Sequence, residues 1–444
     1  MADNSMANNG LSFQTAQIPL RLSPWVIEGA FIVLLLLSFV GLTPFQIRDP
    51  QVLAMTNSAP SSGDGDMIRQ IAFLSVLMVL SAGALQRRGL AIIRAVPVSM
   101  LLVLAWCAAS ALWAGEPGIA FRRAGLEIVV VTSLMLAVEA LGTKRCLELL
   151  RYVMIGVLVV DWISIPLIPQ ARHLANETDP SIVGDWRGLY YQKNITGAVC
   201  ALSILVFGYF ALRDRRKLDY ALLLATAIFL IMTNSKSSMG LLPASLLAAG
   251  LYVVATRTTL DRAIVLTGLA LTFILAAAAI VVEWQTITHI FSDPDAFTGR
   301  VEIWHAELAH IADHPLLGAG FGTFADAGAR SPLYPYVHDK WVGAVAHGHN
   351  GYLQLLVTIG GIGFVLAMAA FIANPVIGFW RGRKDLLLTA FLFSVFIFVL
   401  LHNLTETDFL EGAGPPWAMF VLMIAMLRAR HEDREPEATS WPSR

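Results

Sequence analysis

Long apolar runs alternate with short polar segments along nearly the whole chain. A helix needs about 20 apolar residues to cross the roughly 30 Å of hydrocarbon in a bilayer. Runs of suitable length lie near Trp25–Leu42, Ile68–Leu85, Val96–Trp113, Gly125–Leu141, Tyr152–Ile168, Asn194–Leu212, Leu218–Met232, Ser238–Thr256, Ala263–Val282, Gly351–Ile372, Leu386–Leu401 and Pro416–Leu427. The pattern predicts an all-α fold: a polytopic membrane bundle of about twelve transmembrane helices.

Composition supports a membrane protein and excludes several other classes. The 444 residues are 56% hydrophobic and 14% charged, whereas a soluble domain carries roughly a quarter charged residues. The net charge of -1 gives no basic surplus for nucleic acid, so no nucleic-acid partner is expected. The three cysteines show no C-x-x-C spacing that would indicate a metal or redox site. The informative residues must therefore lie in the polar connections.

The basic residues predict the orientation in the membrane. With the N-terminus in the cytoplasm, the connections on that side carry Arg87, Arg88, Arg94, Lys144, Arg145, Arg151, Arg213, Arg215, Arg216, Lys217, Arg257, Arg262, Arg381, Arg383 and Lys384, as the positive-inside rule expects. We therefore expect residues 1–24 to be a cytoplasmic segment, residues 25–428 a transmembrane domain and residues 429–444 a cytoplasmic tail. A large outward loop is expected at about residues 283–349.

An amphipathic helix is predicted inside this loop, over RVEIWHAELAHIADHP. Val301, Trp304, Leu308 and Ile311 recur at helical spacing and predict the buried stripe, with Glu302 and His310 turned away and Glu307 at its edge. Arg300 shares a face with Trp304 because four residues separate them. Binding to lipid phosphates is the alternative for this arginine. The following GAGFGTF favours a tight turn over a nucleotide site, because no strand-turn-helix unit surrounds it.

The stretch HGHNGYLQLL lies where the outward loop meets the next apolar run. Asn350 is a good N-cap, which places His349 just outside the helix, where the positive end of the dipole disfavours an imidazolium. A neutral imidazole there can act as a base, while free N–H groups of the first turn favour an anion. One alternative is a capping asparagine with two interfacial histidines, and another is metal binding by His347 and His349.

Cations from distant parts of the chain are predicted on the same outward side. Arg187 and Lys193 precede the sixth helix, Lys236 lies in the short NSKSS turn, and Arg300 opens the amphipathic helix. A multiply charged anionic substrate explains this convergence, although lysines at helix ends also reach toward water without a function. The carboxylates of Asp293-Pro294-Asp295 are an alternative means of neutralising diphosphate, through a divalent ion.

Four of these stretches resemble the O-antigen ligase and polysaccharide polymerase superfamily. They are GRVEIWHAELAHIADHPLLGAGFGTF, HGHNGYLQLLVTIGGIG, RGLYYQKN and NSKSSMG, and the variants YYQKN and GHN look closer to the exopolysaccharide polymerase branch. The resemblance implies a multi-pass protein of the bacterial inner membrane. It also implies an undecaprenyl-diphosphate-linked glycan donor, a glycan acceptor and transfer without metal or another cofactor. Other polysaccharide export components are left open as partners.

Residue roles follow from the resemblance. It implies that His349 activates the acceptor hydroxyl, and that Arg187, Lys236 and Arg300 bind the diphosphate, with His347, Asn350, Asn194 and Trp304 in support. Lys236 stands where the family usually has arginine, so it keeps the charge but lacks the planar fork.

The implied activity is that of a metal-independent glycosyltransferase that polymerises or transfers oligosaccharide repeat units in exopolysaccharide biosynthesis. An O-antigen ligase that transfers glycan to lipid A core is the alternative within the family. A transporter or flippase of the lipid-linked glycan and a non-catalytic scaffold subunit are alternatives of other classes. A transporter would be expected to carry ionisable residues in mid-helix, where this chain has few: Glu28, Glu127, Glu139 and Asp161.

Overall fold

The computed structural model describes residues 22–49, 66–177, 179–292, 300–325, 331–336, 348–381 and 385–432. Within these ranges the chain is helical and forms no strand, with one isolated bridge between Arg172 and Trp186. The α-helices are α1 (Pro24–Phe39), α3 (Met67–Arg88), α4 (Val98–Ala109), α5 (Pro117–Leu141), α6 (Thr143–Leu167), α7 (Lys193–Asp214), α8 (Lys217–Met232), α9 (Lys236–Ala255), α10 (Thr259–Val282), α11 (Trp284–Ser292), α12 (Arg300–Asp313), α13 (Gly351–Met368), α14 (Asn374–Arg381), α15 (Leu386–His402) and α16 (Pro415–Glu432).

Each of the twelve apolar runs of the sequence lies in a helix, so the prediction of an all-α polytopic membrane protein is confirmed. Among the described residues, six helical segments are long and apolar enough to cross a bilayer: Met67–Arg94, Pro117–Leu141, Lys193–Asp214, Lys236–Ala255, Thr259–Val282 and Gly351–Arg381. Four shorter apolar helices accompany them, namely Pro24–Phe39, Val98–Leu112, Leu386–His402 and Pro415–Ala429.

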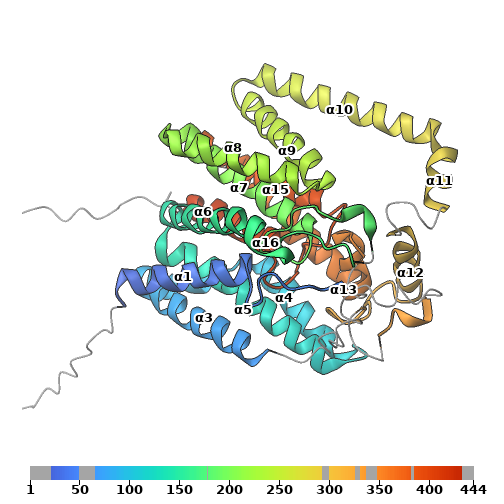
Figure 1. Ribbon diagram of the computed structural model, residues 1–444, viewed down its shortest axis with the longest axis horizontal. Coiled ribbons are helices and arrows are strands. Elements are labelled where there is room, and N and C mark those ends of the chain that lie inside the picture. The colour runs from blue at the N-terminus through green and yellow to red at the C-terminus, as the bar shows by residue number, and fades with distance from the viewer. Residues whose placement is uncertain are drawn as a thin grey trace, which may run out of the picture.

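The helices differ greatly in how far they are buried. The α16 side chains from Trp417 to Leu427 are all buried, and α7 is buried along most of its length. In contrast, α10 has no buried residue and runs along the edge of the bundle (Figure 1). A helix that is apolar on all sides and uncovered by protein must face lipid. The core therefore lies around α5, α7 and α16, and α10 belongs to the lipid-facing surface.

The predicted glycine-rich turn folds back onto α13. The N–H groups of Ala319 and Gly320 donate to the carbonyl oxygens of Val357 and Thr358, each over 2.9 Å. Those carbonyls are available because α13 kinks at Gly360, which has a φ of +66°. A Cβ on Gly360 would lie 2.2 Å from the Leu316 oxygen, so only glycine fits. The turn's backbone groups are thus used within the protein, which argues against a nucleotide-phosphate site.

Candidate functional site

His349 lies at the start of α13, as the sequence predicted. The Asn350 side chain accepts hydrogen bonds from the N–H groups of Tyr352 and Leu353, at 3.0 and 3.1 Å, so the predicted N-cap is confirmed. The N–H of Gly351 donates to the backbone carbonyl oxygens of Asn403 and Glu406, at 2.8 and 3.0 Å. His349 itself has a φ of +51° in the left-handed region, which costs free energy for a residue with a side chain. The start of α13 is therefore anchored to the connection between α15 and α16.

Glu406, from that connection, is the centre of the site. One carboxylate oxygen lies 2.8 Å from Nδ1 of His349. The other accepts from Arg300 at 3.0 Å and from the Asn194 side chain at 2.7 Å, while Arg300 also donates to the Thr405 carbonyl. Four segments far apart in the sequence meet at this one side chain. His349, Arg300 and Asn194 are brought together as the sequence analysis expected, but through a carboxylate that it did not connect with them.

The electrostatics of this cluster keep Glu406 ionised. Burial acts to raise the pKa of the Glu406 carboxyl, but the hydrogen bond with His349 and the charges of His349, Arg300 and His402 hold it well below its usual range. A carboxylate accepts only, so Nδ1 of His349 must carry the hydrogen. When the ring carries one hydrogen, Nε2 is therefore the nitrogen without it, and the side chain is 23% exposed. This arrangement orients the imidazole as a base.

The amphipathic helix α12 is present, but its buried face differs from the predicted one. The buried residues are Val301, Ile303, Ala306, Glu307 and His310, whereas Leu308 is exposed. The prediction for Leu308 and His310 was therefore wrong. The His310 ring is enclosed by Phe324 and Tyr336, with ring centroids 4.9 and 5.4 Å away. Apolar periodicity could not reveal this, because aromatic rings from a distant turn select the buried face.

Trp304 and Glu307 hold the residue that precedes His349. The Trp304 indole N–H donates to the Gly348 oxygen at 2.7 Å. A Cβ on Gly348 would lie 2.1 Å from a Glu307 carboxyl oxygen, so only glycine fits here. Glu307 is almost fully buried, one of its oxygens has no hydrogen-bond partner among the described residues, and burial raises its pKa to about 8. The support for His349 thus includes a carboxyl group that is neutral at physiological pH.

Arg187 is buried in the connection between α6 and α7, with 1% of its surface exposed. Its guanidinium donates to the Gln170 and Tyr191 carbonyls at 2.7 and 3.0 Å and pairs with Glu177 at 3.5 Å. The remaining NH2 nitrogen has no partner in the described part of the chain. Protein groups therefore fix this arginine, and its remaining nitrogen is a buried donor without a partner among the described residues.

Lys236 is exposed at the first position of α9 and makes no hydrogen bond or ion pair with the residues that the structure describes. Its neighbours place it beside the Arg187 connection. The Trp186 N–H donates to the Met232 oxygen at 3.1 Å, and a Cβ on Gly197 of α7 would lie 2.4 Å from Cβ of Ser235. The turn that carries Lys236 therefore packs between the end of that connection and the start of α7.

Two further cations, Arg48 and Arg69, lie near Arg187 and were not singled out in the sequence. The Phe45 N–H donates to the Leu189 oxygen at 2.8 Å, which brings the segment after α1 against the Arg187 connection. The Arg48 guanidinium lies 4.3 Å from the centre of the Tyr191 ring. Arg69, in the first turn of α3, lies close enough to Arg48 for the two charges to interact. Single arginines in a polar loop carry no spacing signal, so the sequence could not identify them.

Among the candidate site residues of the sequence analysis, His347, Asp293 and Asp295 lie outside the described residues. The proposals of metal binding by His347 and of a divalent ion at Asp293-Pro294-Asp295 are therefore not tested by the geometry. Within the described ranges, no group of three or more His, Cys, Asp or Glu side chains is placed to hold a metal ion.

The comparison with protein families gives one match. Residues 221–368 match the model of a family described as O-antigen ligase. This segment is a third of the chain and runs from α8 to the end of α13, so it includes Lys236, Arg300, Trp304 and His349. Arg187, Asn194 and Glu406 lie outside it. The comparison with curated proteins gives no match.

Proposed function

We propose that this chain, whose segment 221–368 supports its place in the O-antigen ligase and polymerase superfamily, is a membrane glycosyltransferase that uses a polyprenyl-diphosphate-linked oligosaccharide as donor. The observation that carries the proposal is the shared Glu406 carboxylate, which joins the His349 imidazole to the Arg300 guanidinium. A base and a cation held by one anchor suit a reaction in which a hydroxyl loses its proton while a diphosphate leaves.

The geometry supports the following chemistry. Nε2 of His349 takes the proton of the acceptor hydroxyl as its oxygen attacks C1 of the donor sugar. The bond between C1 and the diphosphate oxygen breaks, and the diphosphate leaves with the electron pair. Arg300 keeps N–H donors beyond the two used for Thr405 and Glu406, since a guanidinium has five. These donors, the free nitrogen of Arg187 and the Lys236 ammonium would stabilise the developing negative charge.

The carboxylates within the helices favour this proposal over transport. Glu28 pairs with Arg145 at 2.7 Å, Glu139 pairs with Arg88 at 3.0 Å, and Glu127 accepts from the Trp417 indole at 2.5 Å. Asp161 accepts from the Leu189 N–H at 2.9 Å, which supports the Arg187 connection. Each is held by a fixed partner. A relay for a coupling ion would need carboxylates that change partners during transport.

We propose that the reaction joins repeat units in exopolysaccharide biosynthesis, at the outer face of the inner membrane. Transfer of the glycan to lipid A core is the second candidate, which the description of the matching family favours. In both cases the His349 end of the bundle faces outward, the termini are cytoplasmic, and the substrates are the lipid-linked donor and a glycan or lipid A acceptor.

Incubation of the purified protein with a polyprenyl-diphosphate-linked oligosaccharide, with and without lipid A, tests the proposal. A ladder of products indicates a polymerase, and one shifted band that needs lipid A indicates a ligase. His349→Ala abolishes either product, whereas His305→Ala, an exposed histidine on α12, leaves it unchanged. Absence of both products, or wild-type turnover by His349→Ala, contradicts the proposal.

A further inference from the structure

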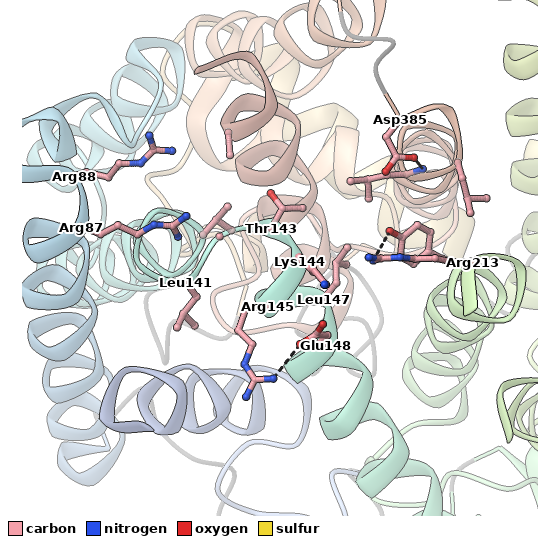
Figure 2. Close-up of a pocket in the computed structure, with 16 residues that line it drawn as sticks. Arg87, Arg88, Leu141, Thr143, Lys144, Arg145, Leu147, Glu148, Arg213 and Asp385 are labelled. Atoms are coloured by element: carbon pink, nitrogen blue, oxygen red, sulfur yellow. Dashed lines mark hydrogen bonds and ion pairs between the residues drawn. The ribbon is translucent and has the colours of Figure 1, made fainter. Parts of the chain in front are cut away.

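A cavity of about 660 Å³ lies at the end of the bundle opposite His349 (Figure 2). It is bounded by the end of α3, the corner between α5 and α6, the end of α7 and the start of α15. The catalytic cluster lies at the start of α7 and the end of α15. Because 22 residues of α7 rise about 33 Å, the cavity is too distant to take part in glycan transfer.

The side chains around this cavity carry a surplus of positive charge. Five cations, Arg87, Arg88, Lys144, Arg145 and Arg213, face two carboxylates, Glu148 and Asp385. Arg145 is neutralised by Glu28 and Glu148, at 2.7 and 3.0 Å. Lys144 makes no hydrogen bond or ion pair with any described residue. Outside the lining, Glu139 pairs with Arg88 at 3.0 Å and Asp214 lies 3.8 Å from Arg213. Arg87 and Lys144 are therefore the lining cations that form no ion pair with the described residues.

Backbone geometry adds to this surplus at the α5–α6 corner. Gly142, with a φ of +81°, ends α5 and begins α6, and no side chain caps the first turn of α6. The first N–H groups of a helix have no partner within it and favour an anion. The start of α15 differs, because Asp385 caps it by accepting from the Leu388 N–H at 2.9 Å.

A second cavity, of about 240 Å³, continues the positive region. It shares Lys144, Glu148 and Arg213 with the first cavity, and it adds Asp214, Arg216 and Arg151, of which Arg151 pairs with Asp219 at 2.5 Å. The two cavities therefore meet at Lys144 and Arg213, where Lys144 is the cation without an ion pair among the described residues.

The remaining lining is apolar, and it points to a lipid. Leu141, Leu147 and Leu387 line the first cavity, while Leu85 and Leu212 are exposed beside its Arg87 and Arg213 edges. A soluble anion would gain nothing from these leucines. A lipid would place its phosphate among the cations and its acyl chains along the exposed leucines.

We propose that this cavity binds the phosphate headgroup of an acidic phospholipid from the leaflet at that end, which the basic connections predict to be cytoplasmic. The site is separate from the glycan-transfer cluster and does not depend on the proposed function. Basic pockets between helices near the cytoplasmic surface have the chemistry for such headgroups.

Native mass spectrometry of the full chain, released from detergent with added phosphatidylglycerol, cardiolipin or phosphatidylcholine, tests this site. Each cation near an anionic surface contributes about 1 kcal/mol, or about fivefold in affinity. The double variant Lys144→Gln/Arg213→Gln is therefore expected to weaken binding of the acidic lipids about 25-fold. The matched control, Lys217→Gln/Arg257→Gln, removes two charges from the same end but outside both cavities. Its lipid binding is expected to stay at the wild-type level.

Two results would overturn the proposal. One is equal retention of acidic lipid by the wild type and the Lys144/Arg213 variant when both show the same thermal transition in phosphatidylcholine. The other is binding of phosphatidylcholine as tight as that of phosphatidylglycerol.

A parallel sample with inorganic diphosphate separates the two sources of phosphate. If diphosphate displaces the acidic lipids completely at an equal concentration, the site selects a soluble anion and the lipid assignment is wrong.

Discussion

Replacement of Glu406 by glutamine tests the orientation of the base most directly. The glutamine oxygen can still accept from Arg300 and Asn194, which now lie 3.0 and 2.7 Å from one carboxylate oxygen. The amide NH2 would then take the position of the oxygen that lies 2.8 Å from Nδ1 of His349. Because this NH2 donates, it stabilises the tautomer with an unprotonated Nδ1 and a hydrogen on Nε2. Nε2 of His349 then already carries a hydrogen, so it cannot take the proton of the acceptor hydroxyl.

The size of the effect follows from what is lost. A positioned general base contributes roughly 10²- to 10⁴-fold to the rate, and a carboxylate that orients a histidine supports that contribution in hydrolase triads. We therefore expect kcat for glycan transfer to fall by roughly 10²- to 10⁴-fold in Glu406→Gln, with a much smaller change in the donor KM. The hydrogen bond from Arg300 persists but its acceptor loses the negative charge, so stability is expected to fall by about 1 kcal/mol.

Initial rates with purified wild type and variant, together with thermal unfolding in the same detergent, measure both effects. Glu411→Gln is the matched control, because Glu411 is an exposed carboxylate in the same connection. A kcat of Glu406→Gln within about threefold of wild type, in a protein that is folded, would refute the proposed orientation of His349.

Three further predictions concern the cations, Glu307 and metal. Arg300→Ala should lower kcat/KM for the donor roughly 10- to 100-fold and Arg300→Lys should recover part of it, because lysine lacks the planar fork. Normal donor use by Arg300→Ala, as expected for the control Arg172→Ala, would place the diphosphate elsewhere. Burial raises the pKa of Glu307 from 4.5 to about 8, so the folded protein holds a proton that the unfolded chain releases, and stability falls as pH rises from about 4.5 through 8. Glu307→Gln should flatten the melting temperature over that window, and an unchanged slope would contradict the assigned burial. Transfer should persist in excess EDTA, whereas loss of turnover that Mg²⁺ or Mn²⁺ restores would favour Asp293 and Asp295 over the cations.

Much of the fold could be predicted because membrane helices are encoded locally. Twelve apolar runs marked twelve helices, and Asn350 marked the start of α13. Helix caps and apolar length depend on neighbouring residues only, so a sequence reports them directly. The tight turn at GAGFGTF was predictable for the same reason, whereas its contact with α13, which joins Ala319 to Val357, was not.

The site could be predicted only in part, because its central contact is not local. His349 and Glu406 are 57 residues apart, and no spacing rule connects a histidine at one helix start with a carboxylate in a later loop. Arg48 was missed since it reaches the site through contact with Tyr191. The buried face of α12 was misjudged because Phe324 and Tyr336 enclose His310. Tertiary packing determined each of these features.

The position of Glu406 limits how this protein can be recombined with its relatives. The family match ends at residue 368, yet the carboxylate that orients His349 belongs to the connection between α15 and α16. A chimera that exchanged only residues 221–368 would combine the histidine of one protein with the carboxylate of another, in place of the native pair of His349 and Glu406. To exchange substrate preference by swapping the segment from α12 to the start of α13, the α15–α16 connection must therefore be exchanged together with it. A library that varies α12 and the start of α13 should hold Asn403 and Glu406 constant.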